Sequence, residues 1–148
     1  MERILILLIA IASHSTISAQ QYIDQYIKDA NKVALSWLND VNHNRYEVAY
    51  NRLTTQLKEQ YDKTTWINQI SELMVEFGDL NSRVIKDISF QSEVEGLEDG
   101  FYVFVKYNTD YEETKNHSEF LMLKQNDKAE WNISDYYYEF QAKEEVEK

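Results

Sequence analysis

The spacing of apolar residues changes at Gly78, and this change limits the possible folds more than any other feature of the chain. Before Gly78, apolar residues recur every three or four positions, which is the period of an amphipathic helix. After Gly78 they recur at every second position and are mostly β-branched or aromatic, as in strands with one buried face. The sequence therefore predicts a group of helices followed by a sheet.

Three helices are predicted before Gly78. The apolar face of the first extends over about five turns and comprises Ile23, Tyr26, Ile27, Ala30, Val33, Ala34, Trp37 and Leu38. Asn42 to Asn44 interrupt it, and Asn44 with Glu47 forms a capping box for a second helix with the apolar residues Tyr46, Tyr50, Leu53 and Leu57. The third helix begins near Thr64 or Thr65 and ends at Gly78, which suits a left-handed closing residue. Its apolar stripe is Trp66, Ile70, Leu73, Met74 and Phe77.

Four strands are predicted after Gly78, at about residues 82–91, 101–107, 119–124 and 131–140. Val84, Ile88 and Phe90 share one face of the first strand. A loop at 95–100 separates the first two strands, and a tight turn at 125–130 joins the last two. The predicted fold class is α+β: three N-terminal helices, then a curved antiparallel sheet of about four strands that curls over the first helix like a cone.

The N-terminus has the pattern of an export signal. Met1 to Arg3 form a short charged region, Ile4 to Ala12 are apolar, and a small polar stretch ends at Ala19. An apolar run this short does not reach the ~20 residues of a membrane-spanning helix. We expect residues 1–19 to be a removable signal peptide, 20–141 a single domain and 142–148 a charged, frayed tail. The mature protein is then periplasmic or secreted, without stable membrane insertion.

Charge and cysteine content narrow the possible partners. The net charge is −11, and the predicted signal contains one acidic and one basic residue, so the mature chain keeps that charge. Nucleic acid and anionic membranes are therefore poor partners. The chain has no cysteine, which excludes disulfides and lipid attachment through a thiol.

Neither a metal site nor a cofactor is predicted. His43 and His117 fall in predicted connections, and neither has a second ligand at metal-binding spacing, so both are interpreted as solvated loop residues. The acidic stretches 93–99 and 110–113 lack the spacing of a calcium loop and are interpreted as solvated turns. No nucleophile motif or glycine-rich phosphate loop occurs.

Four polar or aromatic side chains on the predicted strands are candidates for a ligand-binding site: Arg83, Tyr107, Glu119 and Tyr137. A curved sheet can bring some of them to the mouth of a cavity. Arg83 and Glu119 either form a buried ion pair or orient a polar ligand, and the structural ion pair is the favoured interpretation.

The aromatic content of the chain is high, with 11 Tyr, 6 Phe and 3 Trp. Trp37, Trp66 and Trp131 are expected in the core. Three consecutive tyrosines at 136–138 cannot all point inward from one strand. At least one of them must lie on the outer face or edge of the sheet, where an aromatic patch can recruit a partner chain or a glycan.

A series of short motifs points to a known family. The motifs in order are Trp37-Leu38, Arg45-Tyr46, Trp66, Phe77-Gly78, Ser82-Arg83, Asp99 to Val103, Tyr107-Asn108-Thr109, Glu119, and Trp131 with Tyr136-Tyr137. From Ala30 to Tyr138 the chain resembles the bacterial exported domains of unknown function numbered four thousand and nineteen. The resemblance implies a cone-shaped fold, similar to nuclear transport factor 2-like or cystatin-like domains, in which a bent sheet wraps a long helix and leaves a cavity. It implies very little about function.

Three functions are compatible with these observations. The leading hypothesis is a non-catalytic exported domain that binds an unknown small ligand or a protein partner. The first alternative is a cone-fold enzyme that uses a cavity carboxylate, such as Glu119 or Asp110, as general base. The second is a self-associating structural component of the envelope, whose open sheet pairs edge to edge as a homodimer.

Overall fold

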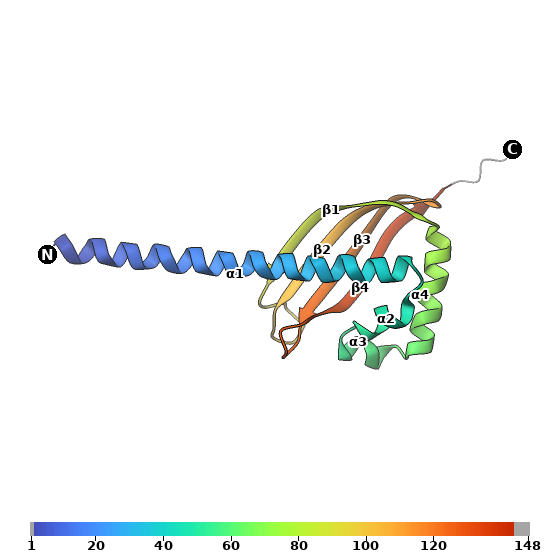
Figure 1. Cartoon of the computed structure of the whole chain (residues 1–148), viewed down its shortest axis with the longest axis horizontal. Coiled ribbons are helices and arrows are strands. Elements are labelled where there is room, and N and C mark those ends of the chain that lie inside the picture. Colours follow the sequence, from blue (N-terminus) through green and yellow to red (C-terminus); the bar gives the residue numbers. More distant parts are fainter. Residues whose placement is uncertain (1, 144–148) are drawn as a thin grey trace.

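The computed structural model describes residues 2–143, with side chains from residue 19 onward. The elements in chain order are α1 (Glu2–Asn42), α2 (Tyr46–Asn51), α3 (Thr55–Gln60), α4 (Lys63–Phe77), β1 (Leu80–Gln91), β2 (Tyr102–Tyr111), β3 (Thr114–Gln125) and β4 (Trp131–Ala142). Figure 1 shows the helices followed by the sheet, as the change of period at Gly78 predicts. The α+β class is confirmed.

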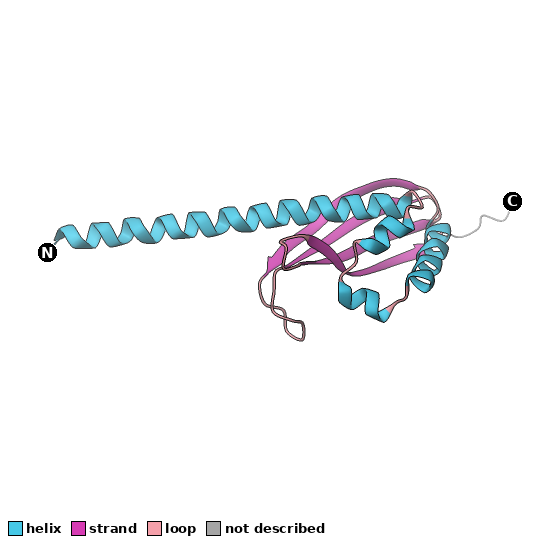
Figure 2. Cartoon of the chain, turned by 60° about the horizontal axis from the view of Figure 1, so that its bottom comes forward, coloured by secondary structure: helices cyan, strands magenta, loops and turns pink. Residues whose placement is uncertain are grey.

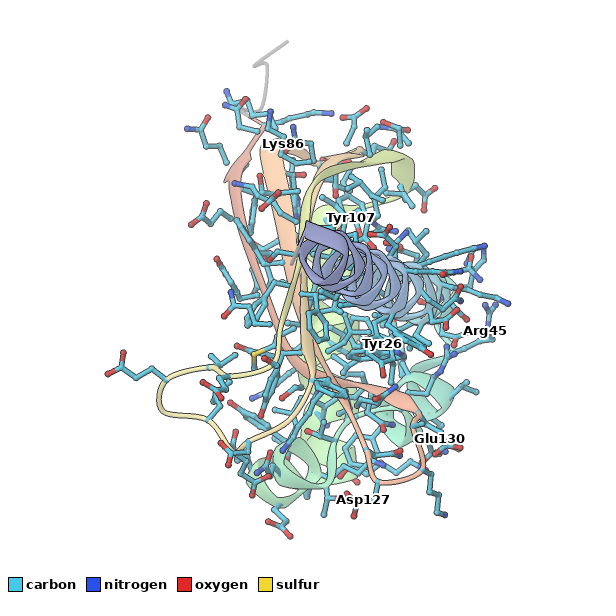
Figure 3. All side chains as sticks on the ribbon, turned by 90° about the vertical axis from the view of Figure 1, so that its left-hand side faces the viewer. Tyr26, Arg45, Lys86, Tyr107, Asp127 and Glu130 are labelled. Atoms are coloured by element: carbon cyan, nitrogen blue, oxygen red, sulfur yellow. The ribbon has the colours of Figure 1, made fainter. Side chains whose placement is uncertain are left out.

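The sheet is open and antiparallel, with the strand order β1-β2-β3-β4. Helix α1 crosses one face of the sheet, which we call the inner face, and α2, α3 and α4 lie near the β4 side (Figure 2). Figure 3, a view along α1, shows the helix on one side of the strands and the turn with Asp127 and Glu130 at their lower end. This arrangement agrees with the predicted curved sheet beside a long first helix.

The core lies between α1 and the inner face. On α1 the predicted stripe packs into the core from Ala30 onward, with Val33 partly buried and with almost no exposure of Ala30, Ala34, Trp37 and Leu38. Opposite them, alternate residues of the central strands are buried: Val103, Val105, Tyr107, Leu121 and Leu123. Large side chains therefore fill the space beneath α1.

The predicted second helix is two short helices instead of one. Arg52 to Thr54 leave the helical conformation because this segment forms a parallel bridge to β4, in which Thr54 N–H donates to the Ile133 carbonyl at 2.8 Å. The predicted capping box is also wrong. Asn44 has a positive φ of 60°, and Arg45 occupies the N-cap position without a side-chain cap. A contact distant in sequence thus overrides the local helical period.

Helix α4 confirms the third predicted helix with a different N-cap. Asp62 accepts a hydrogen bond from the Thr65 N–H at 3.0 Å, so it caps the helix in place of Thr64 or Thr65. The helix ends at Gly78, whose φ of 75° and ψ of −163° are essentially restricted to glycine. A β-carbon there would lie 2.8 Å from Glu113 Cγ in the β2–β3 turn. Gly78 therefore lets the start of the sheet approach this turn closely.

The strands are longer than predicted and contain bulges. The register of β1 with β2 shifts between Ile85 and Asp87, so Lys86 is an extra residue that reverses the alternation of side chains. Val84 consequently points away from the core with 65% of its surface exposed, contrary to the predicted pattern, whereas Ile88 and Phe90 pack against the core. A similar shift near Ser134 interrupts β4.

The two predicted terminal segments are described only in part. Residues 2–19 form the beginning of α1, which extends past the sheet in Figure 1, and Met1 lies outside the described residues. Strand β4 includes Ala142, and residues 144–148 of the predicted tail also lie outside the described part. Within residues 2–143, no helix combines the length and the apolar character needed to cross a membrane.

Candidate functional site

An ion pair between β1 and β3 lies at the centre of the inner face. Arg83 Nε donates to Glu119 Oε2 at 2.7 Å, and the two side chains are 8% and 0% exposed. A buried carboxylate and a buried guanidinium each lose several kcal/mol of hydration, so they persist only when well paired. The pair is the structural ion pair favoured by the sequence.

Three hydroxyl groups complete the surroundings of the Glu119 carboxylate. Thr109 donates to Oε2 at 2.8 Å, and Tyr111 and Tyr136 donate to Oε1 at 3.1 and 2.8 Å. With Arg83, each carboxylate oxygen accepts two hydrogen bonds, which matches the roughly four acceptor sites of a carboxylate. Glu119 therefore has no acceptor capacity left for a ligand.

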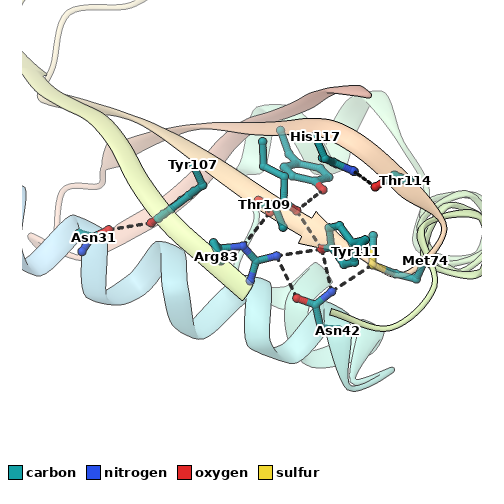
Figure 4. A network of polar contacts seen from close by, with 11 residues as sticks. Asn31, Asn42, Met74, Arg83, Tyr107, Thr109, Tyr111, Thr114 and His117 are labelled. Atoms are coloured by element: carbon teal, nitrogen blue, oxygen red, sulfur yellow. Dashed lines mark hydrogen bonds and ion pairs between the residues drawn. The ribbon is translucent and has the colours of Figure 1, made fainter. Parts of the chain in front are cut away.

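Asn42 connects this arrangement to α1. Arg83 Nη2 donates to Asn42 Oδ1 at 3.0 Å and to the Tyr111 hydroxyl at 2.8 Å. Asn42 Nδ2 in turn donates to the same hydroxyl at 2.9 Å. We call Asn42, Arg83, Thr109, Tyr111, Glu119 and Tyr136 the buried polar network, most of which is labelled in Figure 4. It joins the end of α1 to all four strands.

The protonation states in the network follow from burial and from the charge of Glu119. Burial, followed by the nearby carboxylate, raises the pKa values of the Tyr111 and Tyr136 hydroxyls far above their ordinary range. For Arg83, burial lowers the pKa, but the charge and hydrogen bond of Glu119 outweigh it and the net shift is upward. The tyrosines therefore remain donors and the guanidinium remains charged.

The other two candidate residues lie apart from the network. Tyr107 is opposite Glu119 in the β2–β3 register, but its hydroxyl donates to Asn31 Oδ1 on α1 at 2.7 Å, so Tyr107 fixes the helix. Tyr137 is on the outer face, where its ring stacks on Phe120 with 4.2 Å between centroids. These outer rings border a shallow hollow of about 240 Å³. The structure thus brings together Arg83 and Glu119 but not Tyr137.

His117 is buried, which corrects its interpretation as a solvated loop residue. It lies within β3, is 3% exposed and contacts the ring of Phe77 edge-on at 4.3 Å. Nδ1 is 2.9 Å from Thr114 Oγ1, whereas Nε2 has no hydrogen-bond partner among the described residues. Burial lowers the pKa of the imidazole, the Arg83 charge lowers it further, and the Glu119 charge offsets only part of this.

A cleft of about 400 Å³ opens beside the network, between the helices and β4. On the helical side it is lined by Leu57, Tyr61, Trp66, Gln69, Ile70 and Leu73. On the strand side it is lined by Ile133, Asp135, Tyr136 and Tyr138. We call this space the aromatic cleft. Tyr136 belongs to both features, because its ring lines the cleft and its hydroxyl is held by Glu119.

Comparison with protein families agrees with the resemblance seen in the sequence. Residues 33–136 match the family described as protein of unknown function, DUF4019. The chain belongs to this family. The DUF4019 region contains the whole buried polar network and most of the aromatic cleft. No curated protein and no solved structure matches the chain.

The sequence does not identify Thr109 and Tyr111 as site residues, because the second strand is predicted to end at residue 107 and β2 continues to Tyr111. Thr109 and Tyr111 continue the alternation of Val105 and Tyr107, so a longer strand would have placed them on the inner face. From the sequence, Asn42 is predicted only to interrupt the first helix. Among the described residues, no three or more His, Cys, Asp or Glu side chains are grouped so that they could hold a metal ion.

Breaking the ion pair will destabilise the fold strongly. Glu119→Gln leaves the Arg83 guanidinium buried beside a neutral amide, and we expect a loss of about 3–5 kcal/mol in the free energy of unfolding, measured with urea. Arg83→Met will cost a comparable amount, and the double variant will lose clearly less than the sum of the two. Additive losses would contradict the pairing. Glu47→Gln, in the exposed Lys63–Glu47 pair, is the control and will cost less than about 1 kcal/mol.

Stability will depend on pH through His117. Its pKa is lower in the folded than in the unfolded protein, so the unfolded state binds more protons as the pH falls below about 6.5. The free energy of unfolding will therefore be highest above that pH and decrease between about pH 6.5 and 5, with a slope of at most about 1.4 kcal/mol per pH unit from this group. His117→Asn retains a partner for Thr114 and will flatten the slope. The exposed His43→Asn is the control, and equal slopes in both variants would refute the assignment.

Proposed function

We propose that this protein is a non-catalytic, exported ligand-binding domain whose binding site is the aromatic cleft. The observation that carries the proposal is the double role of Tyr136, which lines the cleft and is anchored to Glu119 through its hydroxyl at 2.8 Å. Trp37 packs edge-on against the Tyr136 ring at 5.2 Å between centroids. The strand side of the cleft is therefore supported by the core, and a ligand meets a preformed surface.

The lining of the cleft supports a particular ligand chemistry. Trp66, Leu73 and Tyr138 offer apolar and aromatic surface, whereas Gln69 and Asp135 supply polar groups. The protein has a net charge of −11, and Asp135 adds a carboxylate to the lining. These features favour a ligand with an apolar portion and a neutral or positively charged end, and they disfavour anions.

The enzymatic alternative has less support. Glu119 is inaccessible and its four acceptor sites are occupied by Arg83 and three hydroxyl groups. A general base must reach the proton that it abstracts, and Glu119 does not line the cleft. Asp110, the other carboxylate considered, is exposed on β2 and also lies outside the cleft. Binding without catalysis is therefore the better supported function.

Uptake of a neutral apolar dye will test the proposed site. We expect Nile red to bind the wild-type protein with increased fluorescence, and Gln69→Trp to reduce its affinity by about 10-fold or more, because an indole at this exposed lining position fills the cleft. Asn68→Trp, at the neighbouring exposed position outside the cleft, is the matched control and will bind as the wild type does. Absence of binding by the wild type, or equal binding by both variants, would refute the site.

Export rests on the N-terminal pattern and agrees with the packing of α1. Tyr26 contacts Phe90, Phe101 and Trp131. Residues 19–22 are exposed, so removal of residues 1–19 preserves these contacts. We expect the protein recovered from its native cells to begin at Gln20, as measured by intact mass. Recovery of a full-length chain from the cytoplasm would contradict export.

A further inference from the structure

Among the described residues, no strand lies beside the outer edge of β4 over most of its length. β4 is the last strand of the sheet, and within residues 2–143 its outer edge forms one bridge, which pairs Ile133 with Leu53. There Ile133 N–H donates to the Arg52 carbonyl at 2.9 Å and its carbonyl accepts from Thr54 N–H at 2.8 Å. This edge therefore already accepts a short stretch of extended backbone at Ile133.

Past this bridge, no strand of the described part of the chain pairs with the edge of β4, although its first N–H group, that of Tyr136, is bonded to a side chain. The Tyr136 N–H bonds to Asp135 Oδ1 at 2.9 Å, so the backbone of Tyr136 faces away from β3. Because backbone groups alternate along a strand, those of Tyr138 and Phe140 face the same way. No other strand pairs with them in the described part of the chain. We call residues 136–140 the free edge.

Side chains next to the free edge differ on its two faces. Tyr136 and Tyr138 point toward the aromatic cleft, across which Trp66, Gln69 and Leu73 of α4 lie. Glu139 is exposed on the outer face beside Tyr137, and the exposed Asp135 lies at the bulge, where it borders both the aromatic cleft and the outer hollow. A strand added to this edge would therefore direct alternate side chains into an aromatic cleft and beside two carboxylates.

We propose that the free edge binds an extended peptide as a fifth strand, with alternating apolar and basic side chains. The apolar residues enter the aromatic cleft, and lysine or arginine residues pair with Asp135 and Glu139, because opposite charges on neighbouring strands attract. This inference rests on the proposed function and specifies the ligand of the same cleft. Pairing of two β4 edges is disfavoured, because it would bring carboxylates of two copies together.

The test uses the capped peptide Lys-Val-Lys-Phe-Lys-Val-Lys and calorimetry with the full chain. Two N-methylated versions, one methylated at the apolar residues and one at the lysines, remove amide donors from opposite sides of the peptide strand. Strand addition predicts that one version loses about 10-fold or more in affinity relative to the other. Hydrogen exchange of the Tyr138 and Phe140 amides will slow when the unmodified peptide binds. Equal affinities of the methylated versions, or unchanged exchange, would overturn the proposal.

Charge variants test the outer face of the added strand. The double variant Asp135→Asn with Glu139→Gln will weaken peptide binding by about 5-fold. The double variant Asp24→Asn with Asp29→Asn removes the same charge from exposed positions on α1 and is the matched control. Equal weakening in both variants would show that only net charge matters, and it would overturn the placement of the basic peptide side chains beside Asp135 and Glu139.

Nile red separates failure of this inference from failure of the proposed function. Dye binding that is lost in Gln69→Trp, without peptide binding, would overturn the fifth strand and leave the aromatic cleft as a site for small apolar ligands. Absence of both dye and peptide binding would overturn both proposals. Peptide binding that is unchanged in Gln69→Trp would also overturn the inference, because the added strand must use the cleft.

Discussion

The buried pair of Arg83 and Glu119 is the interaction on which the rest of the structure depends. Its two charges come from β1 and β3, and the hydroxyls that complete it come from β2 and β4, so one carboxylate fixes the lateral positions of all four strands. Asn42 adds the end of α1. Apolar packing alone tolerates small sliding movements, whereas a buried charge with a missing partner costs several kcal/mol. The network therefore selects one register of the sheet and one position of the helix.

The same network supports the proposed binding surface. The Tyr136 ring packs against Trp37, which also lines the cleft, and its hydroxyl cannot leave Glu119 without leaving a buried acceptor unpaired. Glu119 thus stabilises the cleft through Tyr136 while remaining inaccessible itself. A charged residue in the centre of a domain need not be catalytic. The four hydrogen bonds that the Glu119 carboxylate accepts are sufficient to stabilise its charge in the core.

Local patterns predicted the fold class well because most of the core is periodic. The stripe through Ala30, Ala34 and Trp37 and the alternation of Val103, Val105 and Tyr107 each follow from one segment of sequence. The contacts that local patterns missed depend on distant partners. Leu53 leaves a helical pattern to pair with Ile133, and Asn42 breaks a helix in sequence but binds Arg83 in space. Of the candidate site, the Arg83–Glu119 pair was predictable, but the aromatic cleft depends on how α4 stands beside β4.

The bulge near Ser134 connects the network, the cleft and the free edge. Trp131 and Ile133 precede it and face the core, and the extra residue shifts the alternation so that Tyr136 and Tyr138 face inward as well. Without the bulge, a one-residue change of register would turn Tyr137 and Glu139 inward instead. Tyr137 would then stand opposite Glu119, and the Glu119 carboxylate would lose the hydrogen bond from the Tyr136 hydroxyl. The irregularity in β4 therefore brings the Tyr136 hydroxyl to Glu119, and it also leaves Asp135 at the start of the free edge and Glu139 on its outer side.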